Sequence, residues 1–127
     1  MRYDSSLVIL FMALLAGCAK EKGPVTAHGK PVDYWLQELN NPEAKARQEA
    51  VVALGHVGTA DAGAIPALIE SVKDRDAGVR DKAILALLNI GPGAKGAIPA
   101  LREAENDKDL TVRSHASSAL ARIRGTQ

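Results

Sequence analysis

The sequence repeats itself at a spacing of 33 residues, and this periodicity restricts the chain to a stacked repeat architecture. Arg47, Arg80 and Arg113 recur at this spacing. The string Ala-Ile-Pro-Ala-Leu occurs at 64–68 and again at 97–101. A repeat of this length is a single supersecondary unit that buries its apolar face only against neighbouring units. The sequence therefore predicts a linear array in which each repeat contacts the next.

Each repeat contains two segments with helical periodicity. The longer segment of the middle repeat places its small and apolar residues on one helical face: Val79, Ala83, Ala86, Leu87 and Ile90. Prolines begin the shorter segments, and Gly58 and Gly91 follow the longer ones, as at helix ends. We predict Asn41 as an N-cap with Pro42 in the first turn. The predicted helices are 32–40, 42–57, 64–73, 77–90, 96–105 and 110–124.

A motif recurs at the second helix of the repeats. It runs Asp74-x-Asp76-x-x-Val79-Arg80-x-x-Ala83 and returns as Asp107-x-Asp109-x-x-Val112-Arg113-x-x-Ala116. This pattern resembles the HEAT family, in particular the HEAT-like repeats of phycobilisome lyases, over residues 30–124. The resemblance implies an all-α fold, an α-solenoid of three two-helix repeats at about 30–58, 63–91 and 96–124.

The resemblance also implies a structural ladder of aspartate–arginine contacts between neighbouring repeats. Asp74 with Arg80, and Asp107 with Arg113, occupy the ladder positions of the family. The first repeat carries an asparagine at position 41 where the others carry aspartate, so we expect the ladder contact of Arg47 to be weaker.

Positions that are apolar in the first two repeats become polar in the last one. Ser117 and Ser118 stand where the earlier repeats have valine, isoleucine or leucine, and Arg102 and Glu105 replace apolar residues of the shorter helix. A terminal repeat needs a polar outer face because no further repeat covers it. We therefore expect a complete array of three repeats with a C-terminal cap, and a monomer.

The N-terminal segment has the features of an export signal. Nine apolar residues, 7–15, precede Cys18, the chain's one cysteine. As a helix they span about 13 Å, too short for a hydrocarbon core of about 30 Å. Leu15-Ala-Gly-Cys18 resembles the lipobox of bacterial lipoprotein precursors. We predict a signal helix at 1–17, a lipid on Cys18 and a flexible tether over 18–29; an uncleaved anchor and a plain secretory signal are the alternatives.

Charge and aromatic content argue against nucleic-acid binding. The formal net charge is +1, and the chain has one tryptophan, two tyrosines and one phenylalanine. Nucleic-acid binding uses a basic field and several stacking aromatic rings. Trp35 aligns with Leu68 and Leu101 of the later repeats, so we place it in the core rather than in a binding patch.

The chain lacks a recognisable catalytic or metal-binding motif. His28, His56 and His115 occupy different repeat positions, and no two have the i, i+4 spacing of a helical metal site. The segment Gly91-Pro92-Gly93 has no lysine of a phosphate-binding loop and is typical of an inter-repeat turn. We therefore predict no enzymatic activity, no cofactor and no bound metal.

In the HEAT family the second helices line the concave side of the array, which implies a binding surface there. The side chains expected on it are Gln48, Glu49, Asp81, Lys82, Ser114 and His115. Their mixed charge suits a protein or peptide partner. We predict a lipid-anchored scaffold of the bacterial envelope facing the periplasm, with the outer membrane favoured because Ala19 rather than aspartate follows Cys18. A phycobilisome-lyase-like enzyme subunit and a structural spacer without a discrete ligand are the alternatives.

Overall fold

The fold is an array of helix pairs, which confirms the predicted all-α solenoid. The computed structural model describes residues 23–125. The elements follow one another as β1 (Thr26–Ala27), β2 (Lys30–Pro31), α2 (Val32–Glu38), α3 (Ala44–Val57), η2 (Gly58–Ala60), α4 (Ala64–Ser71), α5 (Ala77–Ile90), η3 (Gly91–Ala97), α6 (Ile98–Ala104) and α7 (Leu110–Arg124). All six predicted helices form, and most of their ends lie within about two residues of the predicted positions.

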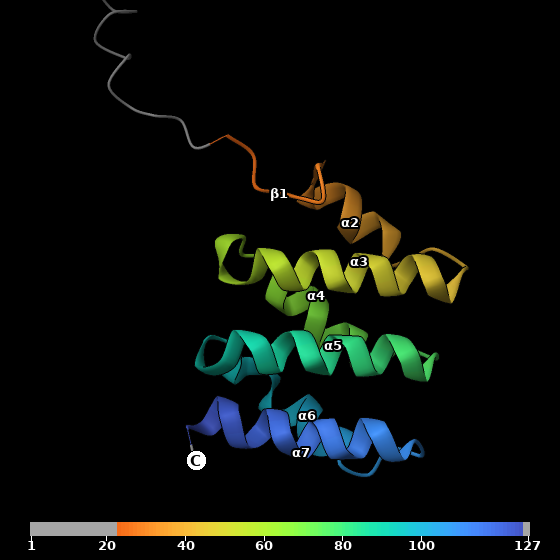
Figure 1. The fold of residues 1–127 in the computed structure, drawn as a ribbon, viewed down its shortest axis with the longest axis vertical. Coiled ribbons are helices and arrows are strands. Elements are labelled where there is room, and N and C mark those ends of the chain that lie inside the picture. Colours follow the sequence, from red (N-terminus) through yellow and green to blue (C-terminus); the bar gives the residue numbers. More distant parts are fainter. Residues whose placement is uncertain (1–22, 126–127) are drawn as a thin grey trace, which may run out of the picture.

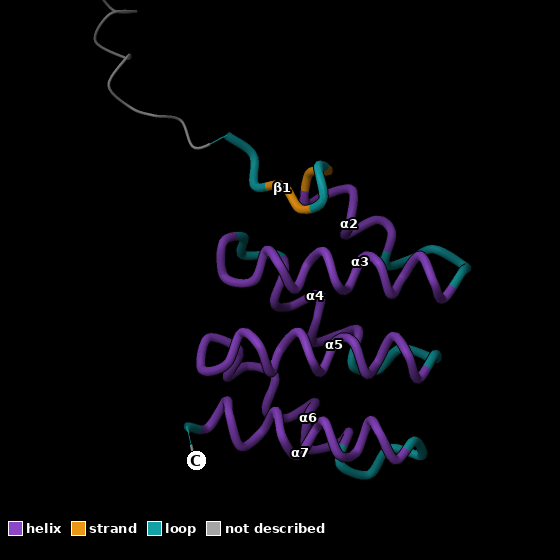
Figure 2. Tube along the Cα trace, viewed as in Figure 1, coloured by secondary structure: helices purple, strands orange, loops and turns teal. Residues whose placement is uncertain are grey.

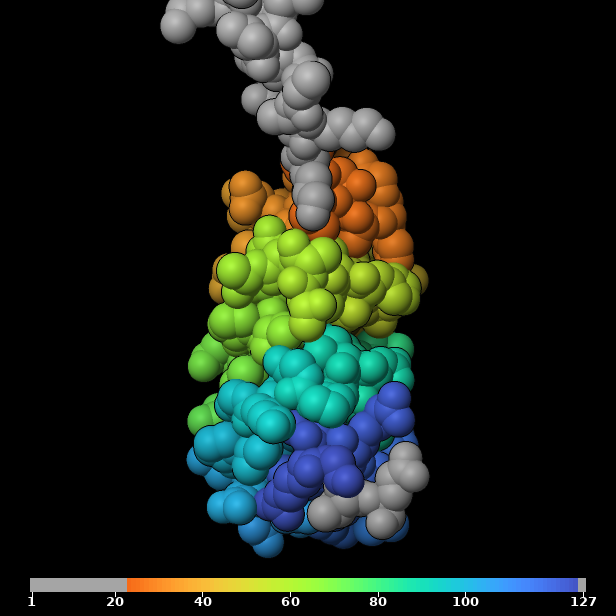
Figure 3. Space-filling model, turned by 90° about the vertical axis from the view of Figure 1, so that its left-hand side faces the viewer, coloured from red at the N-terminus to blue at the C-terminus, as the bar shows by residue number. Residues whose placement is uncertain are grey.

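The repeats stack in sequence order along the long axis of the molecule. The longer helices α3, α5 and α7 lie side by side, and the shorter helices α4 and α6 lie behind them (Figure 1). The Cα trace shows the same alternation of long and short helices joined by tight turns (Figure 2). In the space-filling view the repeats form successive layers from the N-terminal to the C-terminal end (Figure 3). Each repeat therefore packs mainly on its sequence neighbours.

Alanines and aliphatic residues at equivalent positions form the core. Ala50, Ala83 and Ala116 are completely buried, and so are the leucines at 54, 87 and 101. Small side chains let helices approach closely, while the leucines and isoleucines fill the remaining space. The periodicity that predicted the helices thus also marks the residues that hold neighbouring repeats together.

A β-hairpin precedes the first helix, where the sequence predicted part of a flexible tether. β1 and β2 pair in antiparallel register. His28 and Gly29 form the turn with φ of 49° and 74°, the positive φ values that a two-residue hairpin turn of this kind requires. The predicted end of the tether at residue 29 is therefore wrong, because this segment has an ordered packing partner in the first repeat.

Trp35 is that packing partner. Its Nε1 donates a 2.8 Å hydrogen bond to the carbonyl oxygen of Ala27, and both residues are buried. Trp35 lies in the core as predicted, while Tyr34 beside it is 39% exposed. The predicted signal helix and Cys18 fall in residues 1–22, outside the described residues.

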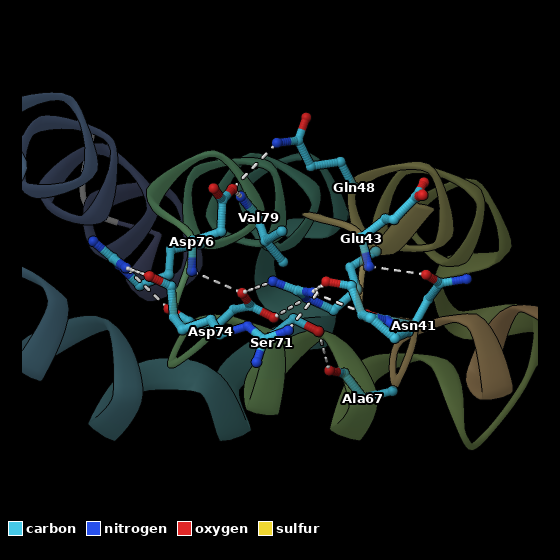
Figure 4. Close-up of polar contacts among 12 residues, drawn as sticks. Asn41, Glu43, Gln48, Ala67, Ser71, Asp74, Asp76 and Val79 are labelled. Atoms are coloured by element: carbon cyan, nitrogen blue, oxygen red, sulfur yellow. Dashed lines mark hydrogen bonds and ion pairs between the residues drawn. The ribbon is translucent and has the colours of Figure 1, made fainter. Parts of the chain in front are cut away.

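The first long helix begins differently from the predicted start. The N-cap of α3 is Glu43, whose side chain makes no capping bond. Asn41 Oδ1 instead accepts a 2.9 Å hydrogen bond from the Glu43 N–H (Figure 4). The predicted N-cap role of Asn41 is wrong because its side chain closes a turn that precedes the helix, which begins at Ala44. In the next repeat, Asp76 caps α5 by accepting from the Val79 N–H at 2.9 Å.

Glycines end the longer helices of the first two repeats, as the sequence predicted. Gly58 and Gly91 have φ of 53° and 70°, values that side chains with a Cβ rarely adopt. After Gly91 the chain forms the 3-10 segment η3, so α6 begins at Ile98 rather than at the predicted residue 96. Ala94 interrupts this segment with φ of −102° and ψ of 28°.

The outer face of the last repeat is polar. Ser117 and Ser118 are exposed on α7, and Arg102 and Glu105 are exposed at α6. Ser117 Oγ donates a 2.9 Å hydrogen bond to Glu105 Oε1. The equivalent positions of the middle repeat include the completely buried Ile84. The change from apolar to polar residues thus coincides with the change from buried to exposed.

Residues 77–104 are long and apolar enough to be a membrane-spanning candidate by length and composition alone. They form three elements, α5, η3 and α6, that pack against one another and against α7. The chain turns at Gly91, and Leu87 and Leu101 are completely buried in the core. The apolar character of this stretch is therefore accounted for by packing inside the array.

Candidate functional site

Two buried arginines join neighbouring repeats. Arg47 on α3 donates from Nε and Nη2 to the carboxylate oxygens of Asp74, at 2.9 and 3.1 Å. Arg80 on α5 forms the same fork with Asp107, at 2.8 and 2.9 Å. The arginines are 5% and 6% exposed. Two parallel charge-assisted bonds fix both distance and orientation, so each pair sets the position of one repeat on the next.

The ladder pairs differ from the predicted ones. Each ion pair joins an arginine to the aspartate of the following repeat, 27 residues later. Within a repeat the arginine contacts backbone instead: Arg80 Nη1 donates to the Asp74 carbonyl at 2.9 Å, and Arg113 Nη1 to the Asp107 carbonyl at 2.6 Å. The guanidinium thus bridges the loop before its own helix and the carboxylate of the next loop, which corrects the pairing of Asp74 with Arg80 and of Asp107 with Arg113.

The expected weakness of the Arg47 contact is also wrong. Arg47 pairs with Asp74, so the asparagine at position 41 does not remove its carboxylate partner. Arg47 Nη1 donates to the carbonyls of Asn41 and Pro42, at 2.8 and 3.0 Å. A backbone carbonyl is present whatever side chain stands at position 41. The first contact of the ladder is therefore as complete as the second.

The ladder and the adjacent helix caps shift the pKa values of their charged groups. Burial raises the pKa of Asp107, but the hydrogen bonds from Arg80 and the Asp109 N–H, together with nearby positive charge, outweigh it and leave this pKa below its ordinary value. The hydrogen bond with Asp74 raises the pKa of Arg47 despite its burial. The hydrogen bond from the Val79 N–H, and then that from Gln48, lower the pKa of Asp76. These groups therefore keep their charges in the folded state.

A groove follows the boundary between α3 and α5. It consists of two depressions of about 330 and 220 Å³ that share Val52 and Lys82. We call it the α3–α5 groove. Its apolar lining includes Val52, Leu85 and Ala86, and its charged lining is Lys45, Glu49 and Lys82. The arrangement suits a ligand that places an apolar group between charged ones.

The close approach of the two helices determines the floor of the groove. A Cβ atom added to Gly55 would lie 2.9 Å from the Cβ of Ala86, which is closer than two carbon atoms pack. Glycine at this position therefore lets α3 lie directly against α5. The side chains on either side of this contact then form the walls.

A family model of HEAT repeats matches residues 32–121. The chain belongs to the HEAT-repeat family. Among solved structures it is similar to an engineered protein from the Northeast Structural Genomics Consortium, with a TM-score of 0.62 and 24% sequence identity. The alignment covers 75% of this chain and 46% of the engineered protein, so the chain spans less than half of it. This likeness concerns the fold. The search of curated proteins finds no match.

Three of the six side chains predicted on the binding surface of the HEAT array contact neighbouring repeats. Gln48 Nε2 donates to Asp76 Oδ1 at 3.2 Å, with both residues drawn in Figure 4. Asp81 Oδ1 and His115 Nδ1 lie 2.5 Å apart and join α5 to α7. These contacts give Gln48, Asp81 and His115 a part in holding the HEAT repeats together.

The other three predicted side chains are differently placed. Glu49 and Lys82 both line the α3–α5 groove. Neither of them forms an ion pair within residues 23–125. Ser114 is exposed on α7, and its carbonyl accepts a 3.1 Å hydrogen bond from Ser118 Oγ. The structure thus brings Glu49 and Lys82 together at one groove and leaves Ser114 away from it.

Sequence reasoning missed a histidine pair that lines the groove, with one histidine in each depression. His28 Nε2 and His56 Nδ1 lie 2.9 Å apart, although 28 residues separate them in the chain. The His28 ring also meets the Trp35 ring edge to face, with centroids 5.8 Å apart. The sequence signal was His28-Gly29, a turn dipeptide between two short extended segments. Reading it as a hairpin would have moved His28 from the tether to the first HEAT repeat.

The described part of the chain offers no arrangement typical of catalysis. Residues 23–125 contain no group of three or more histidine, cysteine, aspartate or glutamate side chains that could hold a metal ion. Asp81 and His115 form an acid–imidazole pair, but the Ser118 hydroxyl donates to a backbone carbonyl rather than to His115. A nucleophile bonded to the imidazole would be needed for triad chemistry.

Proposed function

We propose that this HEAT-repeat chain is an interaction module of the bacterial cell envelope, anchored by a lipid on Cys18 and binding a protein or peptide along the α3–α5 groove. The observation that carries the binding proposal is the groove itself. It combines apolar floor residues with Glu49 and Lys82, which make no ion pair within the described residues. Exposed mixed charge around an apolar floor suits a macromolecular partner.

The anchoring proposal rests on the sequence Leu15-Ala-Gly-Cys18 and the apolar run before it. The described chain begins at Gly23, and the hairpin that follows lies at the α2 end of the array (Figure 1). Gly23 is five positions after Cys18, and an extended chain spans at most about 3.5 Å per residue. A lipid on Cys18 would hold Gly23, which precedes the hairpin, within roughly 20 Å of the membrane surface. Ala19 favours the outer membrane, with the array facing the periplasm.

The anchoring proposal predicts that Cys18→Ala moves the protein from the membrane fraction to the soluble fraction of the cells that produce it. Ser6→Ala, also in the N-terminal segment, is the matched control and should leave the protein with the membrane. Membrane association of Cys18→Ala that persists at high salt would contradict the lipid anchor.

The binding proposal predicts that chemical cross-linking captures a partner with the parent chain but not after Glu49 and Lys82, which line the groove, are changed to alanine. The control changes Lys95 and Glu103, which lie outside the groove, to alanine and should capture the same partner. Equal capture by both variants would place the binding surface elsewhere. No enrichment with the parent would favour a structural spacer.

A further inference from the structure

We infer that the partner segment in the α3–α5 groove is an acidic peptide, with one glutamate or aspartate next to an aliphatic side chain. This inference rests on the proposed binding function of the groove and adds the chemistry of the partner. It follows from the charge of the lining, the position of Lys82 and the apolar floor.

Positive charge predominates along the groove. Lys45 and Lys82 line it together with a single carboxylate, that of Glu49. Neither lysine forms a salt bridge within residues 23–125. Asp76 accepts hydrogen bonds from Gln48 and the Val79 N–H, and Asp81 contacts His115. An incoming carboxylate would therefore meet two lysines that form no ion pair in the described part of the chain.

Lys82 is the central cation of the groove. It lines both depressions, where they meet at Val52, and its side chain is half-buried. A half-buried lysine covers apolar surface with its methylene groups and presents its ammonium at the edge. A carboxylate placed there interacts in a medium of lower effective dielectric than open solvent, so the attraction is stronger than at an exposed lysine.

The apolar floor of the groove favours a partner with an aliphatic side chain next to that carboxylate. Val52, Leu85 and Ala86 line the depression of about 220 Å³ beside Lys82. Burying an aliphatic side chain against them would remove apolar surface from water on both partners. Glu49 stands at the other side of Lys82, in the depression of about 330 Å³. Its negative charge disfavours a second carboxylate, which restricts the motif to one acidic residue with an aliphatic neighbour.

The test is a selection from a library of random peptides displayed at the N-terminus of a coat protein, with the full chain as bait. In this format the peptides have no free carboxyl terminus. We expect the selected peptides to be enriched in a single aspartate or glutamate beside leucine, isoleucine or valine. Recovery of these peptides should fall at least about tenfold with the Lys45→Gln/Lys82→Gln variant. The Lys95→Gln/Lys108→Gln control carries the same charge change outside the groove and should retain them.

Three results would overturn the inference. Peptides without acidic residues that are lost on Val52→Asn/Leu85→Asn, but not on the lysine substitutions, would leave the proposed function standing and remove the acidic motif. If no selected peptide depends on the groove residues, the result would contradict both the acidic motif and the proposed binding function of the groove. Binding of the full chain to phosphatidylglycerol vesicles that depends on Lys45 and Lys82, without peptide selection, would make a lipid surface the occupant. Melting curves of each variant would establish that it is folded.

Discussion

At the scale of single residues, the buried arginines Arg47 and Arg80 bond both to a carboxylate and to backbone carbonyls. Arg80 donates through Nε, Nη1 and Nη2, reaching the Asp107 carboxylate and the carbonyls of Asp74 and Arg75. A charge removed from water requires such complete partnering. The recurrence of arginine every 33 residues is therefore explained by structure rather than by ligand binding.

We predict that Arg80→Met lowers the free energy of unfolding by roughly 3 kcal/mol, because Asp107 would remain as a nearly buried carboxylate without its cation. Lys73→Met is the control, since its 3.4 Å pair with Glu103 is exposed, with 57% and 69% of the side chains accessible. An exposed pair contributes about 0–1 kcal/mol. Urea unfolding followed by circular dichroism measures the free energy of unfolding of each variant. Equal decreases for Arg80→Met and Lys73→Met would contradict a special role of the buried ladder.

The lowered pKa values of Asp76 and Asp107 make stability depend on pH. A carboxyl group whose pKa is lower in the folded state stabilises the fold above its unfolded pKa, ordinarily 3.8, and that contribution disappears as the pH falls through the folded pKa. We predict a urea midpoint that is flat from about pH 7 to 5 and falls below about pH 4.

Asp107→Asn removes one of these titrating groups. Its stability should be lower than that of the parent at neutral pH, and it should decrease less on acidification. A variant whose acid dependence equals that of the parent would show that other groups govern the acid transition.

At the scale of helices and strands, periodicity predicted the six helices because each has its own apolar face and its own end signals. Gly58 and Gly91 fixed two of the C-terminal ends. The hairpin of β1 and β2 was not predicted, since each strand has two residues and no periodicity exists at that length. The hairpin is held against the first repeat by the hydrogen bond from Trp35 to Ala27, a tertiary contact that sequence patterns do not show.

The contact between α3 and α5 is a second feature that sequence alone did not reveal. We predict that Gly55→Ala destabilises the fold by about 1–2 kcal/mol, because the new methyl group would meet Ala86 Cβ at 2.9 Å. Alanine has the better helix propensity by about 1 kcal/mol, so a net loss identifies packing as the cause. The double variant Gly55→Ala/Ala86→Gly should show favourable coupling in a double-mutant cycle. Additive losses would mean that the two helices do not touch there.

At the scale of the whole molecule, each repeat contacts its neighbours, and the α3–α5 groove lies between two of the long helices. Sequence reasoning identified Glu49 and Lys82 as surface residues because repeat positions specify which way a side chain faces. It did not identify Lys45, His28 or the apolar floor as parts of the same site. Their proximity depends on the hairpin and on the α3–α5 approach, both of which are set by tertiary packing.

The most direct test of the central claim is site-specific photo-crosslinking in the cells that produce the protein. A photoreactive amino acid would replace Asn89, an exposed residue that lines the groove, so that Lys82 is kept, and in a separate variant it would replace Lys108 outside the groove. We predict a discrete adduct between the chain and one partner from position 89 and none from position 108. No adduct from position 89, or the same adduct from both positions, would contradict the assignment of the α3–α5 groove as the binding surface.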